Sequence, residues 1–158
     1  MNDHADTYSI REKNLWFEFL SDIAIALYYW PKAIPLMLAG DDALRSGAMA
    51  NLIASTVVWA IVVTTALSIF LHTQRKPEPM DERDYLIAAR GSHVAVRMLV
   101  ACVLVVIGLI VFRELTDAAQ LDVFPLSPLV IAHLLLVSLM LWSMTSTIIR
   151  LFCYRRGY

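Results

Sequence analysis

Four blocks of apolar residues, separated by polar stretches, dominate the pattern along this chain. They cover approximately residues 15–38, 48–71, 92–112 and 126–149. A helix of roughly 20 mostly apolar residues is long enough to cross a bilayer. Within the blocks the apolar residues run together and do not alternate with polar ones, which favours helices in lipid over strands. The pattern therefore predicts an all-α integral membrane protein, a four-helix bundle with its transmembrane domain over 15–150.

The first block is the least regular of the four. It contains two acids, a lysine and two prolines, namely Glu18, Asp22, Lys32, Pro31 and Pro35. A proline inside a helix removes a backbone hydrogen bond and clashes with the preceding turn, so we expect a kink or break after Trp30. Two arrangements of residues 31–47 stay open. The segment either continues a kinked span or lies along the outer membrane interface.

Composition agrees with a membrane protein. Of the 158 residues, 59% are hydrophobic and 17% are charged, whereas a soluble domain carries about 25% charged residues. The net charge of −1 provides no strong positive field, so we expect no nucleic-acid partner. The segment 1–14 lacks the basic start and small-residue cleavage site of a signal peptide, and we interpret it as a mature N-terminal tail.

The common sequence patterns of enzymes are missing. There is no HExxH, no P-loop and no GxSxG. The two cysteines, Cys102 and Cys153, are isolated from one another. His93 and His133 fall at different depths of their predicted spans, so one haem could not use both. We therefore expect a protein that is not an enzyme, with no metal and no cofactor.

Basic residues predict the orientation in the membrane, because lysine and arginine concentrate on the cytoplasmic side. One side of the four-span arrangement carries Arg11, Lys13, Arg75, Lys76, Arg83, Arg90, Arg150, Arg155 and Arg156. The other side carries only Lys32, Arg45 and Arg113. We therefore predict that the tails 1–14 and 151–158 are both cytoplasmic. The expected location is the cytoplasmic (inner) membrane of a bacterium.

A line of arginines leads into the third block. The arginine stripe consists of Arg83, Arg90 and Arg97. Asp81 is expected to cap a helix that runs to Phe112, and about 32 residues at 1.5 Å each give a length of about 48 Å. Because this exceeds the membrane core, the first turns should protrude into the cytoplasm or the headgroup layer. The heptad spacing places the stripe on one face together with Ile87, and Gly91 should let a neighbouring backbone approach closely.

Three interpretations of the stripe stay open. In the first interpretation, Arg83 and Arg90 are solvated and Arg97 reaches the lipid phosphates. In the second, the stripe binds anionic lipid headgroups or a partner protein. In the third interpretation, Arg97 forms an ion pair inside the membrane with an acid of the first span. Charged groups in a membrane usually face the helix bundle and pair with one another. We therefore predict an intramembrane polar cluster of Glu18, Asp22, His93 and Arg97, in which Glu18 or Asp22 contacts Arg97. Such a cluster either fixes the helix register or binds a proton, a small cation or a polar ligand.

The segment DERDYLIAARGSHVAVRML, over 81–99, resembles the juxtamembrane motif of a family of small bacterial and archaeal membrane proteins without an assigned activity. In that family a DER(E/D)xxI…R pattern precedes the third of four spans. The matching residues are Asp81, Glu82, Arg83, Asp84, Ile87 and Arg90. The resemblance implies a four-span architecture. It also implies a protein partner, since some similar proteins are thought to act together with regulators.

Two functions fit these observations. The first is a non-enzymatic accessory subunit or regulator that contacts a protein partner, or a second copy of itself, through its cytoplasmic face. The second is a small proton-linked carrier that uses the polar cluster. A carrier predicts a water-accessible cavity that reaches Glu18 and Asp22, whereas an interaction protein predicts a filled bundle. Membrane lipids, including anionic ones, are expected partners in both cases.

Overall fold

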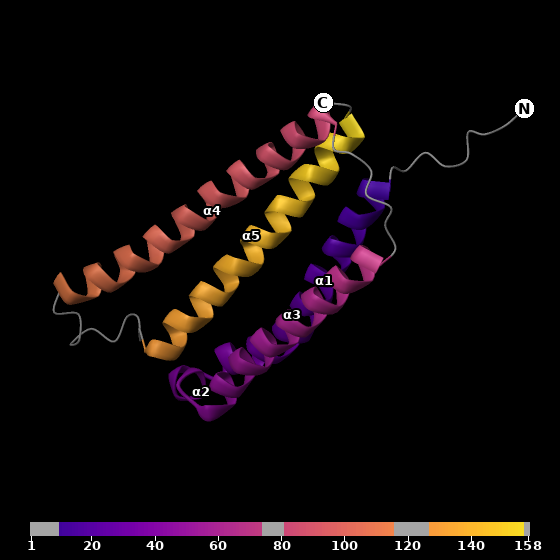
Figure 1. The fold of residues 1–158 in the computed structure, drawn as a ribbon. Helices are drawn as coiled ribbons and strands as arrows, with labels where there is room; N and C mark the ends of the chain where they lie inside the picture. The colour runs from indigo at the N-terminus through magenta and orange to yellow at the C-terminus, as the bar shows by residue number, and fades with distance from the viewer. Residues whose placement is uncertain (1–9, 74–80, 116–126, 157–158) are drawn as a thin grey trace, which may run out of the picture.

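The computed structural model describes residues 10–73, 81–115 and 127–156, and these residues are helical almost throughout. Four long helices are present: α1 (Ile10–Leu38), α3 (Gly47–Thr73), α4 (Glu82–Leu115) and α5 (Pro128–Arg156). A short helix, α2 (Asp41–Leu44), lies between α1 and α3 (Figure 1). No strand occurs among the described residues. The predicted all-α class is therefore confirmed.

Three of the described helices, α3, α4 and α5, are long and apolar enough to cross a membrane. They coincide with the second, third and fourth predicted blocks. Helix α1 has a similar length, but it contains Asp22, Lys32 and two prolines and is not among these three helices. The chain is thus a helical protein with three helices suited to a bilayer, and the crossing of α1 stays a prediction.

Helix α1 continues through both of its prolines. It reaches Leu38 without interruption, so the helix does not break after Trp30. The backbone N–H of Ala39 donates to the carbonyl of Pro35 at 3.0 Å and closes the last turn. Gly40 then adopts a φ of 98°, a left-handed conformation that glycine accepts at little cost, and the chain turns into α2. Residues 31–38 therefore extend α1.

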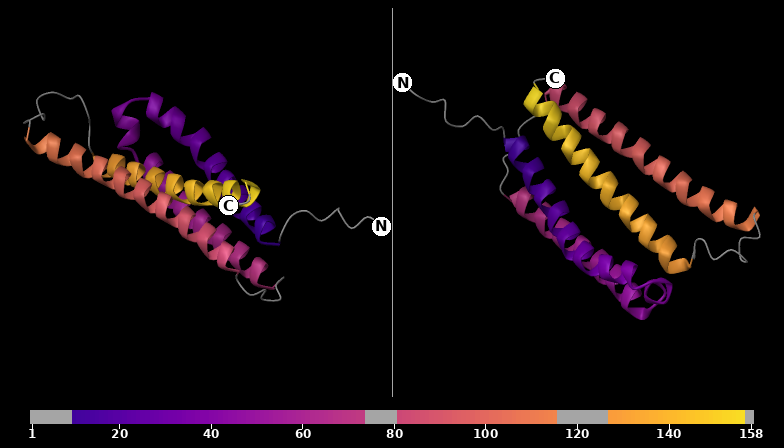
Figure 2. Two further views of the ribbon diagram at one scale, coloured as in Figure 1. Left: turned by 90° about the horizontal axis from the view of Figure 1, so that it is seen from above. Right: turned by 180° about the vertical axis from the view of Figure 1, so that it is seen from behind.

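The long helices are arranged around α5. Helix α1 packs on both α3 and α5, whereas the extensive contacts of α4 are with α5 alone. Figures 1 and 2 show α5 between α4 on one side and the pair of α1 and α3 on the other. Helices α1 and α4 begin at the same end of the molecule at which α3 and α5 end. The closed four-helix bundle that the sequence suggested is therefore not confirmed, because α4 lies at the edge.

The main core lies between α1, α3 and α5. Its fully or nearly buried members are Tyr29, Ala33, Met49, Leu52 and Leu136. Partly buried aromatic and aliphatic side chains, including Tyr28 and Trp30, pack around them. Many other apolar side chains of α3 and α4 are exposed, among them Ile61 at 60% and Leu104 at 60%. Outward-facing apolar surface of this extent suits helices surrounded by lipid.

Candidate functional site

A group of charged and aromatic residues joins three helices at the end where α1 and α4 begin and α5 ends. We call Arg11, Glu12, Asp84, Tyr154 and Arg155 the polar cap. Asp84 forms an ion pair with Arg11, and Tyr154 donates a hydrogen bond to Asp84 Oδ1 at 2.6 Å. Arg155 lies 3.8 Å from Glu12 Oε1, and its guanidinium lies over the Trp16 ring at 5.3 Å. The polar cap thereby ties α1, α4 and α5 together.

The first turn of α4 orients Asp84. The backbone N–H of Glu82 donates to Asp81 Oδ1 at 2.7 Å, and the N–H of Asp81 donates to Asp84 Oδ2 at 3.2 Å. The bond from Asp81 to Asp84 is one half of a capping box, and the Asp81 side chain accepts from the first helical N–H instead of the third. The predicted capping role of Asp81 is confirmed. Asp84 therefore acts both in the cap of its own helix and in the contact with α1 and α5.

Beyond the polar cap, α4 approaches α5 closely at Gly91. A Cβ atom at this position would lie 2.6 Å from Arg150 Cγ and 3.1 Å from the carbonyl oxygen of Ser146. Ala95, one turn further along α4, is fully buried, and Arg150 also donates to Ser92 at 3.3 Å. Small residues four apart permit such close packing of membrane helices. The close approach predicted at Gly91 is confirmed.

The arginine stripe lies on the outer side of α4. Arg83, Arg90 and Arg97 are all exposed, and so is His93. At about 100° per residue, positions seven apart differ by only about 20° around the helix, so the three arginines share one side. Ile87 departs from the expectation. It is only 2% exposed, and it belongs to the face of α4 that packs on α5.

The predicted intramembrane cluster divides between α1 and α4. Asp22 accepts a hydrogen bond from Ser143 of α5 at 2.8 Å, and Glu18 of α1 acts on it electrostatically. Arg97 is exposed on α4, whose extensive contacts are with α5. No contact joins Asp22 to Arg97 among the described residues, and the pairing of Glu18 or Asp22 with Arg97 stays a prediction. The physical reason for the separation of Asp22 from Arg97 is that α4 packs at the edge, against a different side of α5 from α1.

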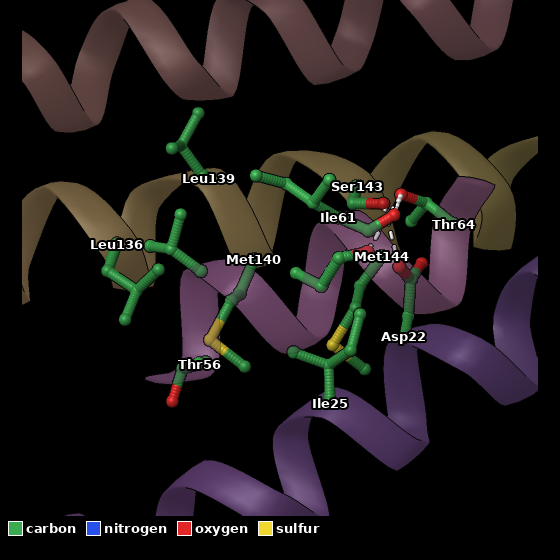
Figure 3. Close-up of a pocket in the computed structure, with 12 residues that line it drawn as sticks. Asp22, Ile25, Thr56, Ile61, Thr64, Leu136, Leu139, Met140, Ser143 and Met144 are labelled. Atoms are coloured by element: carbon green, nitrogen blue, oxygen red, sulfur yellow. Dashed lines mark hydrogen bonds between the residues drawn. The ribbon is translucent and has the colours of Figure 1, made fainter. Parts of the chain in front are cut away.

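Asp22 instead lines a cavity between α1, α3 and α5. The cavity has a volume of about 220 Å³, and its lining is largely apolar. Figure 3 shows Asp22 and Ser143 pointing toward one another at one end of it, joined by their hydrogen bond. Met140 and Met144 reach from α5 toward α1 in the same view. The sequence identified Asp22 as a candidate but did not indicate its partner on α5.

A second buried polar contact was missed by sequence reasoning. The hydroxyl of Tyr29 on α1 is hydrogen-bonded to His133 Nδ1 on α5, and the two rings are stacked with centroids 5.7 Å apart. Both side chains are buried, and Trp30 packs edge-on to the His133 ring. The only sequence signal is a histidine in an apolar block, because a buried histidine needs a hydrogen-bond partner. Nothing in the sequence identified that partner as Tyr29.

The described residues contain no group of three or more histidine, cysteine, aspartate or glutamate side chains placed to hold a metal ion. Comparison of the chain with protein-family models, with curated proteins and with solved structures gives no significant match. Two features of the molecule are therefore candidate sites. One is the exposed arginine stripe next to the polar cap, and the other is the cavity at Asp22.

Proposed function

We propose that this chain is a non-enzymatic integral membrane protein that acts as an accessory or regulatory subunit through its cytoplasmic face. The observation that carries the proposal is the division of the segment 81–97 into two sides. Asp84 and Gly91 hold α4 onto the rest of the molecule. The arginine stripe lies on an exposed side of α4.

The proposal includes the membrane arrangement. We infer that α1 crosses the bilayer together with α3, α4 and α5, which gives four spans with both termini in the cytoplasm. Two observations support this inference. Helix α1 packs lengthwise on α3 and α5, and its start contacts the start of α4 and the end of α5 through the polar cap. The excess of lysine and arginine at this end favours the cytoplasmic side.

The partner of the stripe is an acidic surface on a cytoplasmic region of another protein. Three guanidinium groups on a rigid helix can form bidentate contacts with carboxylates at a fixed spacing. The hydrogen bonds of Asp81 and Asp84 and the polar cap hold the first turns of α4 in place, so little ordering is needed on binding. A docking role thus explains both the charges and the rigid support beneath them.

A proton-linked carrier built on Glu18, Asp22, His93 and Arg97 has less support. That mechanism needs the acids and the bases in one polar site. Asp22 faces α5 and the cavity, whereas Arg97 and His93 are exposed on α4. The cavity at Asp22 is the one observation in its favour, and that cavity is largely apolar.

The test is extraction of the protein from its native membrane in nanodiscs, followed by mass analysis of the proteins and lipids retained. The variant combines Arg83→Gln, Arg90→Gln and Arg97→Gln, and the control is Arg45→Gln, an exposed cation at the opposite end. We expect one stoichiometric acidic protein with the wild type and with the control, and its loss with the triple variant. A wild type that retains only copies of itself would contradict the proposal. So would loss of anionic lipid alone from the triple variant, since the stripe would then be a lipid anchor.

A further inference from the structure

The cavity between α1, α3 and α5 has the composition of a small binding site. It combines apolar side chains from all three helices with a single carboxylate. The lining residues are Asp22, Ile25, Thr56, Val57, Ala60, Ile61, Thr64, Leu136, Leu139, Met140, Ser143 and Met144. Sites for small molecules are typically apolar and hold few polar groups, which fix the orientation of the ligand. Asp22 is the group that would do so here.

Asp22 has hydrogen-bonding capacity that its neighbours do not use. Its Oδ1 accepts from Ser143, but its Oδ2 is shielded from solvent and has no hydrogen-bond partner among the described residues. The hydroxyls of Thr56 and Thr64 donate to carbonyls of their own helix, each at 2.7 Å. They therefore have no proton to offer the carboxylate. Asp22 Oδ2 is left as an acceptor for a donor that enters the cavity.

The charge of the lining favours a cation as that donor. No lysine, arginine or histidine lines the cavity, and Glu18, one helical turn from Asp22, adds negative charge to it. A carboxylate within a membrane is costly unless an opposite charge compensates it. An ammonium group at Oδ2 supplies both the missing hydrogen bond and the missing charge.

Volume and lining describe the rest of the ligand. An apolar cavity of about 150 Å³ holds benzene, so the 220 Å³ found here accommodates a ring with a short chain. Met140 and Met144 are flexible, and their sulfur atoms make favourable contacts with aromatic rings. Val57, Ile61 and Leu139 line the cavity and are exposed on the membrane-facing side of the molecule. A ligand dissolved in the bilayer could therefore pass between them.

We propose that this cavity binds a protonated lipophilic amine of arylalkylamine size, with its ammonium group on Asp22 and its ring against Met140 and Met144. The ligand reaches the site sideways from the bilayer. The site is separate from the arginine stripe, which lies on the outer side of α4. Its presence does not depend on a protein partner, and the two proposals can fail independently.

The test measures saturable binding of 2-(4-fluorophenyl)ethylamine by fluorine NMR, with the full chain in phosphatidylcholine nanodiscs. Empty nanodiscs correct for partitioning into lipid, and 4-fluoroethylbenzene serves as the uncharged analogue. We expect the amine to bind at least tenfold more tightly than the uncharged analogue. Equal binding of both compounds, or no binding beyond empty nanodiscs, would overturn the proposal.

Two variants locate the site. Asp22→Asn keeps the shape of the side chain and should weaken amine binding at least tenfold while leaving the uncharged analogue unaffected. Ala60→Phe places a ring in the cavity while keeping the Asp22 carboxylate in the chain, and should abolish binding of both compounds. Gly108→Ala is the control, because nothing lies within 4 Å of the added methyl group. Full binding by either cavity variant would place the amine elsewhere and refute the assignment.

A third variant separates charge from structure. Ser143→Ala removes the hydrogen bond to Asp22 but keeps the carboxylate, so amine binding should persist within threefold. A loss as large as that in Asp22→Asn would mean that the contact is structural, and would count against the site. Repeating the measurement with phosphatidylethanolamine distinguishes two sources of the ammonium group. Competition by this lipid that requires Asp22 would assign the site to a lipid amine, and absence of competition would assign it to a free amine.

Discussion

Helix α5 has two interfaces that differ in kind. Toward α4, the contact includes the small residues Gly91 and Ala95, and a carbon atom added at Gly91 would collide with Arg150. Toward α1 and α3, the contact is made by large side chains with buried polar pairs and a cavity of about 220 Å³. The first interface leaves the arginine stripe of α4 exposed. The second encloses polar groups between α1, α3 and α5, including Asp22 at the cavity. The two interfaces therefore border different candidate sites.

The largest effect is expected from closing the gap at Gly91. In Gly91→Leu the new side chain collides with Arg150 and with the backbone of Ser146, so α4 must move away from α5. Overpacking of this kind costs about 3 kcal/mol in the free energy of unfolding. The measurement is equilibrium unfolding by SDS in mixed micelles. Gly108→Leu on the same helix is the matched control, because its side chain meets open space and should leave stability nearly unchanged.

A smaller loss of stability is expected at the polar cap, which joins α4 to α1 and α5. Asp84→Asn removes the charge that Arg11 faces and weakens the bond from Tyr154, at a cost of about 2 kcal/mol. Cys153, next to Tyr154, is buried, so its labelling by a maleimide in a Cys102→Ala background should accelerate as the cap opens. Glu82→Gln, at an exposed position of the same turn, is the control. Equal labelling of both variants would mean that Asp84 does not hold the cap closed.

The buried pair of Tyr29 on α1 and His133 on α5 should contribute less to stability. Tyr29→Phe leaves His133 Nδ1 without its buried partner, and we expect about 1 kcal/mol lower stability in the same SDS titration. Tyr28→Phe is the comparison, since its hydroxyl bonds to Ser55 and Lys32 at a half-buried position and should matter less. If both variants lose the same stability, the Tyr29–His133 pair has no special role in the core.

The smallest effect on stability is expected at the arginine stripe. Arg90 is exposed, and Arg90→Gln should change the free energy of unfolding by less than about 0.5 kcal/mol. The same variant should weaken partner retention from native membranes. A stability loss as large as that of Asp84→Asn would show that the stripe is structural, and would erase the distinction between the two sides of α4.

The sequence predicted the helices better than their arrangement. The apolar blocks located α3, α4 and α5, because length and hydropathy decide which segments cross a membrane. Gly91 was identified as a close-packing position because glycine has no side chain to keep a neighbouring helix away. The contact of Asp22 with Ser143 was not predictable, because it depends on which side of α5 packs against α1. Four polar residues at one depth therefore suggested a single cluster that the packing separates.

The ends of the helices show a second limit. Helix α1 begins at Ile10 and α5 continues to Arg156, so both extend into segments that we interpreted as tails. These turns are held by Arg11, Asp84 and Tyr154, which are far apart in the sequence. Hydropathy detects only the part of a helix that lies in lipid. A helix end stabilised by contacts between distant charges carries no such local signal.

The most direct test of the proposed function places a photo-crosslinking amino acid at position 90 in cells and compares it with position 104. Both positions are exposed on the same side of α4, but Leu104 lies within the apolar part of the helix. We predict that position 90 crosslinks to one protein, at an acidic segment, and that position 104 crosslinks to lipid. The crosslink at 90 should disappear when Arg83 and Arg97 are both changed to Gln. Crosslinking to lipid alone at both positions would contradict the role of the arginine stripe as a docking surface.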